Sequence, residues 1–213
     1  MEKGSLVFCD TNVCIDRTLA FIEPQIFNDY LDSVKDAIAK LTNGKDPCKM
    51  LLSPVVISEL KSNYILLKEI QNFCVKKLRY KRTSYKIMQI KSRAEKSIRK
   101  FIEKYSLSQD LIALTKDYGN NKADVENFYL KHPNTLKQIT TEKLRGLSPQ
   151  QKVRKIAQRP SHLPEENDLL LLAHAIELNN KQENPVAIFS RDKDFTKFKA
   201  EIPQEFGIQI FSL

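Results

Sequence analysis

Three short apolar runs, each ending at a polar residue, constrain the fold of this chain most strongly. They are residues 5–9 (SLVFC), 49–53 (KMLLS) and 186–190 (VAIFS). A continuous apolar run of this length is typical of a strand in a parallel sheet, because helices cover both faces of such a sheet. Residues 208–211 (IQIF) predict a fourth and final strand.

Helical patterns separate these runs. Apolar residues recur every three or four positions in residues 27–41 and again in residues 169–176, which predicts helices with one buried face. Ser148 and Pro149 predict a helix start before residues 150–158, because a serine cap followed by proline suits a first helical turn. Strands that alternate with helices predict an α/β fold in which helices flank a parallel sheet.

The middle of the chain is helical and basic. Residues 61–160 carry 24 Lys/Arg against 8 Asp/Glu, a net charge of +16, whereas the two flanks carry 11 against 18, a net charge of −7. No strand pattern occurs between residues 60 and 185, and residues 84–105 predict a long helix with one apolar and one basic stripe. We therefore predict a basic, all-helical insertion at residues 76–159, inside an acidic core of residues 1–75 and 160–213. A solvated, lysine-rich helical surface is the alternative explanation.

The cysteines and the chain's start predict a cytoplasmic location with reduced thiols. The four cysteines are Cys9, Cys14, Cys48 and Cys74. They form no C-x-x-C pair, and no basic, apolar, cleavable leader is present. A structural zinc site is not expected, and Cys9 and Cys74 are expected to be buried. No apolar run approaches the length of a membrane span.

Four acidic residues occupy comparable places in this pattern. Asp10 follows the first strand, Glu59 lies on the helix after the second, Asp168 opens a helix, and Asp192 follows a later strand. The carboxyl ends of adjacent parallel strands meet at one crevice, so these side chains are expected to converge. Converging carboxylates repel one another unless a cation neutralises them. Oxygen ligands suit Mg²⁺ or Mn²⁺, and one or two such ions activate water for cleavage of a phosphodiester.

Each acid also has a simpler explanation when it is taken alone. Asp10 or Thr11 can cap a helix. Asp168, together with Glu165 and Glu166, can stabilise the positive end of a helix dipole, and for Asp168 alone this is the stronger interpretation.

Taken together, four segments resemble the motif blocks of the PIN (PilT N-terminus-like) family of metal-dependent nucleases, in order. They are Leu6–Asn12 (LVFCDTN), Ser53–Leu60 (SPVVISEL), Asn167–Ala175 (NDLLLLAHA) and Ile188–Phe195 (IFSRDKDF). The resemblance covers about the first 65 and the last 50 residues. It implies a PIN-like parallel sheet flanked by helices, and an Mg²⁺- or Mn²⁺-dependent endonuclease that cuts RNA.

The resemblance also assigns roles to individual residues. Those implied as catalytic residues and as metal ligands, directly or through water, are Asp10, Glu59, Asp168 and Asp192. Asn12 and Ser190 would orient them by hydrogen bonds. Asp194 has two interpretations, either joining the metal site or capping the helix that begins near Lys193, and capping is the favoured one. No histidine is needed as a general base if the ion activates water.

Basic residues in the middle segment are predicted to contact RNA phosphates. They are Lys76, Lys77, Arg79, Lys81, Arg82, Lys86, Arg93, Lys96, Lys100 and Lys104. Tyr80 and Tyr85, interleaved with the first group, would stack on bases. In the alternative interpretation these tyrosines pack against the core. The apolar face of the long helix could instead hold two copies of the chain together.

The biological role of such a nuclease is less constrained. A PIN core with a basic helical insertion resembles the single-protein ribonuclease P group, which implies RNA processing and tRNA 5′-end maturation. The insertion argues against a small toxin nuclease of a toxin–antitoxin pair. A catalytically inactive RNA-binding scaffold is the other alternative. A dehalogenase-like phosphatase would need an aspartate where Asn12 stands, and a dinucleotide-binding enzyme would need a G-x-G-x-x-G motif that is absent.

Overall fold

A four-stranded parallel sheet forms the centre of the structure, a computed structural model that describes residues 5–22, 48–76, 85–105 and 119–212. The strands lie in the order β2-β1-β3-β4, and all neighbours are parallel. Their bounds are Leu6–Cys9 (β1), Lys49–Leu51 (β2), Val186–Phe189 (β3) and Gln209–Phe211 (β4). The predicted α/β fold with a helix-flanked parallel sheet is confirmed, and each strand begins and ends close to its predicted bounds.

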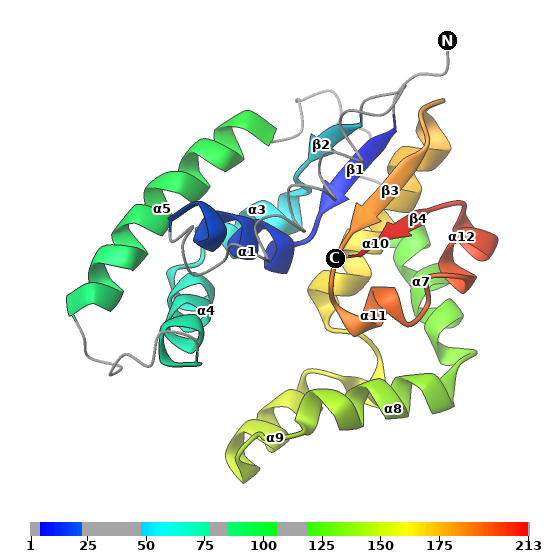
Figure 1. The fold of residues 1–213 in the computed structure, drawn as a ribbon. Helices are drawn as coiled ribbons and strands as arrows, with labels where there is room; N and C mark the ends of the chain where they lie inside the picture. Colours follow the sequence, from blue (N-terminus) through cyan, green and yellow to red (C-terminus); the bar gives the residue numbers. More distant parts are fainter. Residues whose placement is uncertain (1–4, 23–47, 77–84, 106–118, 213) are drawn as a thin grey trace.

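The helices form two groups beside the sheet (Figure 1). Next to β1 and β2 lie α1 (Thr11–Ile22), α3 (Pro54–Lys61), α4 (Asn63–Lys76) and α5 (Tyr85–Tyr105). Next to β3 and β4 lie α7 (Gly119–Leu130), α10 (Glu166–Lys181), α11 (Lys193–Thr196) and α12 (Glu201–Phe206). Beyond the carboxyl ends of β1 and β3 lie α8 (Pro133–Leu144) and α9 (Pro149–Ala157), followed by the short 3₁₀ helix η1 (Pro160–His162).

Two of the helices in the predicted insertion are packed into the body of the protein. In α5 the apolar stripe is buried, as the pattern predicts, and the helix packs against α1 and α4. In α7, Val125, Phe128 and Tyr129 are buried, and the helix packs against α10, which in turn packs on β3. Because the apolar face of α5 is covered within one chain, that face is not available to a second copy.

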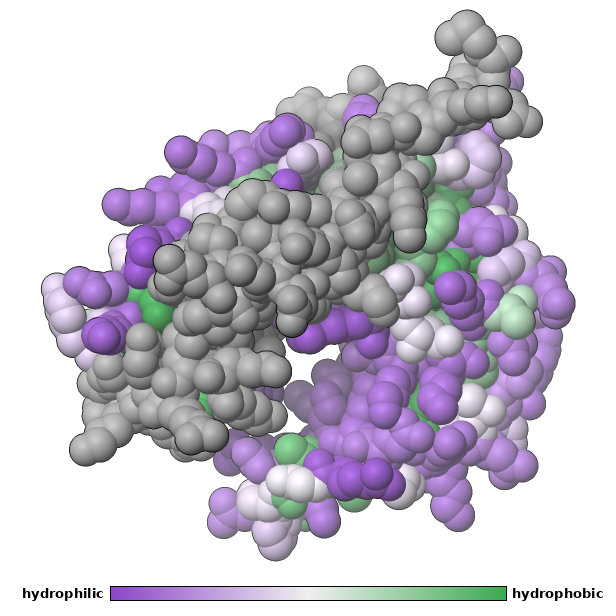
Figure 2. All heavy atoms as spheres, viewed as in Figure 1, coloured by the Kyte–Doolittle hydropathy of each residue, from purple (hydrophilic) through white to green (hydrophobic). Residues whose placement is uncertain are grey.

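Helix α9 is different because none of its residues is buried. Its predicted start is confirmed, since Ser148 and Gln151 form a capping box ahead of Pro149. Val153 and Ile156 are exposed on it. Figure 2 shows hydrophobic surface at the place of α9 within an otherwise mainly hydrophilic region.

Other expectations have mixed outcomes. Cys9 and Cys74 are buried as expected, and all four cysteines are free thiols. The predicted helix at residues 27–41 lies outside the described residues. Within the part of the chain that the structure describes, every element between residues 76 and 159 is helical. None of the described helices combines the length and the apolar character that crossing a membrane requires.

Candidate active site

The ends of β1 and β3 bring Asp10 and Asp192 together. Asp10 follows β1, and its backbone N–H donates to the carbonyl of Phe189 at 3.0 Å. Ser190 follows β3, and its hydroxyl donates to Asp10 Oδ2 at 2.5 Å while accepting the backbone N–H of Asp192 at 2.9 Å. One buried hydroxyl therefore links the two acidic segments.

Asn12, in the first turn of α1, also orients Asp10. Its Nδ2 donates to Asp10 Oδ2 at 2.7 Å, so the same carboxylate oxygen accepts from both Asn12 and Ser190. The Oδ1 atom of Asn12 is buried and has no hydrogen-bond partner. An unpaired buried acceptor is costly unless something binds it. The site thus presents an oxygen without a partner beside a buried carboxylate.

Glu59 reaches the site from α3. This helix begins directly after β2 because Ser53 caps it, accepting the N–H of Val56, and because Pro54 occupies its first turn. The hydroxyl of Thr11 and the Nδ2 of Asn167 both donate to the Glu59 carboxylate, the latter at 2.6 Å. Thr11 and Asn167 are the sequence neighbours of Asp10 and Asp168, so Glu59 lies between these two acids.

Asp168 lies in the first turn of α10, which begins at Glu166. Desolvation raises the pKa of its carboxyl well above the ordinary value of 3.8, and the negative charges of Asp192 and Asp10 raise it further. Asp10 is only 5% exposed. Burial raises its pKa to about 6; the Ser190 hydrogen bond works against this rise, while Asp192 and Glu59 add to it. The four acids therefore act on one another as a single cluster.

Asp192, not Asp194, caps α11. Asp192 has an extended backbone and its Oδ1 accepts the N–H of Asp194 at 2.9 Å. The favoured interpretation of Asp194 as the helix cap is therefore wrong. The reason is that α11 begins at Lys193, which places Asp194 inside the first turn, where its side chain points into the protein.

Asp194 is the centre of a buried ion-pair network. Its side chain is 0% exposed, and Arg159, also 0% exposed, donates to both of its oxygens at 2.6 and 2.7 Å. Lys143 lies 2.6 Å from Oδ2, and the Tyr129 hydroxyl donates to the Asp194 carbonyl at 2.8 Å. Although burial opposes ionisation, Arg159 and Lys143 hold the pKa of Asp194 below its ordinary value.

The acids that lie close enough together to share a metal ion differ from the four predicted ligands. Single carboxylate oxygens of Asp168, Asp192 and Asp194 all lie within 4.8 Å of one another. Both Asp194 oxygens, however, already accept from Arg159, and Lys143 shares one of them. Asp10 and Asp168 are better candidates for ligands of a divalent ion, because their pKa values stay raised, in Asp168 even with Lys143 nearby. Glu59 and Asp192 lie beside them. Their oxygen-only donor set and the unpaired Asn12 oxygen fit Mg²⁺ or Mn²⁺.

No protein-family model, curated protein or solved structure matches this chain. Evidence for a function comes from the geometry and electrostatics of the chain's own residues.

Three other acids near the cluster are ion-paired. Asp16 pairs with Arg191 at 2.8 Å. Glu166 pairs with Lys122 at 2.6 Å, and Glu165 pairs with Lys155. Two of the three histidines are poorly suited to act as a base. Burial lowers the pKa of His174 to about 4, and His132 packs on the rings of Phe128 and Phe198.

The predicted RNA-binding residues fall into two groups. Lys86, Arg93, Lys96, Lys100 and Lys104 are exposed along α5, and Lys76 ends α4. Lys77, Arg79, Lys81 and Arg82, with Tyr80, lie outside the described residues. Tyr85 is 72% exposed, so the interpretation in which it packs against the core is wrong.

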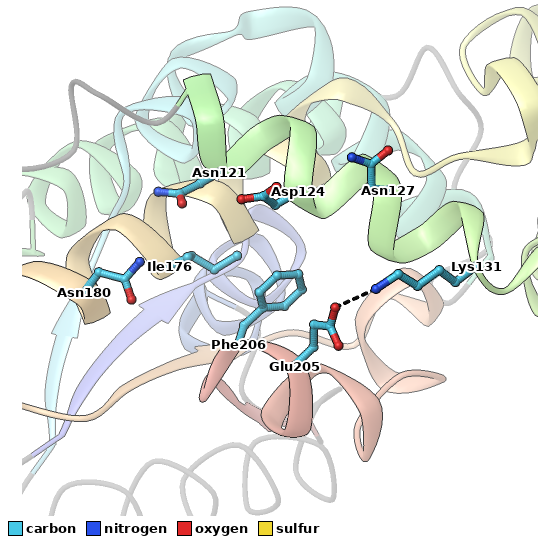
Figure 3. A pocket seen from close by; sticks show the side chains of 8 residues that line it. All are labelled: Asn121, Asp124, Asn127, Lys131, Ile176, Asn180, Glu205 and Phe206. Carbon is cyan, nitrogen blue, oxygen red and sulfur yellow. Dashed lines mark hydrogen bonds and ion pairs between the residues drawn. The ribbon is translucent and has the colours of Figure 1, made fainter.

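One pocket is lined by none of the four acids. It has a volume of about 560 Å³ and is enclosed by α7, α10 and α12. Figure 3 shows side chains from all three helices, among them Asn121, Ile176 and Phe206, and an ion pair between Glu205 and Lys131 at 2.8 Å. Its polar lining consists of amides, the Asp124 carboxylate and one ion pair, which offer no nucleophile and no cluster of three metal-ligating groups, so its volume does not make this pocket the active site.

Sequence reasoning did not assign a role to four residues that contact the acids. Thr11 and Asn167 lie inside the motif-like segments, and their position beside Asp10 and Asp168 is a signal that could have identified them. Lys143 and Arg159 have no such signal, because nothing in their neighbourhood distinguishes them among the 35 Lys and Arg residues.

Proposed function

We propose that this chain is an Mg²⁺- or Mn²⁺-dependent endoribonuclease of the PIN type. The observation that carries the proposal is the group of carboxylates around Asp10 and Asp168 at the carboxyl edge of a parallel sheet. Burial raises the pKa of both acids, Asp192 raises both further, and Asp10 adds to the rise of Asp168. A bound cation would relieve this repulsion. Glu59 and Asp192 complete the proposed ligand set.

Each polar neighbour has a distinct task in this proposal. Ser190 and Asn12 fix the orientation of Asp10, while Thr11 and Asn167 fix that of Glu59. A divalent ion bound there supplies an activated water and neutralises charge on the phosphate. Rigid hydrogen-bonded ligands favour this chemistry because the site needs little reorganisation during the reaction.

RNA is the proposed substrate because exposed basic side chains line α5 within a basic segment of the chain. Their charge suits a polyanion without selecting a sequence. In this proposal residues 76–159 form the basic helical insertion of a PIN-like fold, and the role is RNA processing. Maturation of tRNA 5′ ends is its most specific form.

The test is cleavage of a small RNA panel by purified protein with Mg²⁺ or Mn²⁺. The panel holds an unstructured RNA and a precursor tRNA with a 5′ leader. We expect cleavage that excess chelator abolishes, and that Asp10→Asn slows on the order of 10³-fold at saturating protein. Asp124→Asn is the matched control, because it removes an exposed carboxylate on α7.

Two results would contradict the proposal. Undiminished cleavage in excess chelator would exclude a metal-dependent mechanism. Tight RNA binding without turnover, in wild type with either metal, would instead favour the inactive scaffold.

A further inference from the structure

Lys143 of α8 extends into the acidic cluster. Its Nζ lies 2.6 Å from Asp192 Oδ1 and 2.6 Å from Asp194 Oδ2, and its side chain is only 14% exposed. Its ammonium is thus paired with two carboxylates, and the protein itself places a positive charge at this position.

Three carboxylates lie close together at this position. Oxygens of Asp168, Asp192 and Asp194 lie within 4.8 Å of one another, and Lys143 contacts two of these three residues. A magnesium ion requires ligand oxygens at about 2.0–2.1 Å. An ion between Asp192 and Asp194 would therefore almost coincide with the ammonium, so both cannot be held there.

Several contacts keep the ammonium in place. Arg159 donates to both Asp194 oxygens and Tyr129 holds the Asp194 carbonyl, so this carboxylate cannot turn away. The neighbouring Glu142 pairs with Lys193, which joins α8 to the start of α11. The contacts between α8 and the start of α11 therefore hold Lys143 in position.

On the basis of the nuclease function proposed above, we propose that Lys143 replaces a second metal ion. The site then binds a single divalent ion near Asp10, and Lys143 contacts a non-bridging oxygen of the RNA phosphate beside Asp192. Many nucleases use a second ion to neutralise the phosphate during in-line displacement. A lysine ammonium supplies the same kind of point charge.

The test measures Mn²⁺ binding to the metal-free full-length protein by isothermal titration calorimetry, without RNA. Wild type is expected to bind a single Mn²⁺. Lys143→Met should bind two, because it leaves Asp168 and Asp192 without the nearby ammonium, and Lys143→Arg should stay at one. Lys137→Met is the matched control, since it removes an exposed ammonium from the same helix and should also stay at one.

A kinetic measurement accompanies the titration. Single-turnover cleavage at saturating protein should slow about 100-fold in Lys143→Met, the typical cost of losing one group that stabilises charge in the transition state. Lys137→Met should keep the wild-type rate.

Two Mn²⁺ ions in wild type, or only one in Lys143→Met, would overturn the inference and leave the proposed nuclease standing. If Lys143→Met does not fold, Lys143→Gln takes its place in the titration, and two ions are again expected. Absence of Mn²⁺ binding in wild type would instead reject the metal-dependent function itself.

Discussion

Asp10 and Asp194 are both buried carboxylates, yet the protein treats them in opposite ways. Asp194 is surrounded by Arg159 and Lys143, and its pKa is lowered. Asp10 receives hydrogen bonds from neutral groups and faces other acids, and its pKa rises to about 6. Burial is common to both, so burial alone does not indicate function. The difference is that the protein supplies the counter-charge for Asp194, whereas the groups that act on Asp10 are neutral or acidic. In the proposed function, an external cation supplies the counter-charge for Asp10.

Neutralising each acid in turn tests the difference between Asp10 and Asp194 most directly. Asp194→Asn should lower the free energy of unfolding of the metal-free protein by about 3–5 kcal/mol, because it leaves buried Arg159 without its partner. Asp10→Asn should raise the free energy of unfolding at pH 7, because it removes an uncompensated charge. Urea denaturation of both variants measures the two changes.

Asp124→Asn again serves as the control, with an expected change within about 0.5 kcal/mol for a surface position. The comparison fails if Asp194→Asn and Asp10→Asn shift the urea midpoint in the same direction.

The second prediction concerns pH and is smaller. The folded-state pKa of Asp10 is about 6 and its ordinary value is 3.8, so folding favours the protonated acid. Its contribution to stability is fully present below pH 3.8 and is lost as the pH rises through about 6. The stability advantage of Asp10→Asn over metal-free wild type should therefore grow by up to about 3 kcal/mol between pH 4 and pH 7.

Asp194 should show the opposite dependence. Its folded-state pKa is lowered, so its stabilising effect is present above pH 3.8 and is lost as the pH falls further. Urea unfolding at several pH values measures both trends. An Asp10→Asn advantage that stays constant with pH would show that Asp10 is not the group that titrates.

The smallest expected effect concerns the exposed cations of α5, which face solvent instead of a buried acid. Replacing Lys86, Arg93, Lys96, Lys100 and Lys104 with glutamine should weaken RNA binding. Each lost contact with single-stranded RNA should reduce the slope of log affinity against log salt by roughly 0.7, so five reduce it by about 3.5 at most. Single-turnover cleavage at saturating protein should not change.

Binding of one labelled RNA between low and moderate salt gives this slope. Lys91→Gln is a useful control, because Lys91 pairs with Glu95 on the same helix and should alter the slope less. An unchanged slope in the five-fold variant would remove α5 from the RNA-binding surface.

The sequence predicts those parts of the structure that depend on local patterns. The apolar runs locate all four strands, and the acids that follow β1 and β3 lie at the expected edge of the sheet. The ion pairs of Asp194 could not be predicted in this way. They join residues 35 and 51 positions apart, and any exposed lysine or arginine has the same local appearance as Lys143 or Arg159. The cap of α11 was misassigned because a shift of two residues changes which aspartate precedes the helix.

The pairing of β1 with β3 has one further consequence. Both strands are apolar and buried along their whole length, so sliding one past the other by a single residue would still bury hydrophobic side chains. Hydrophobic alternation, which normally sets strand register, is therefore weak here. The hydrogen bond from Ser190 to Asp10, one step beyond the last paired residues Cys9 and Phe189, forms only in the observed alignment. The polar groups of the candidate active site thus also specify how the central strands align.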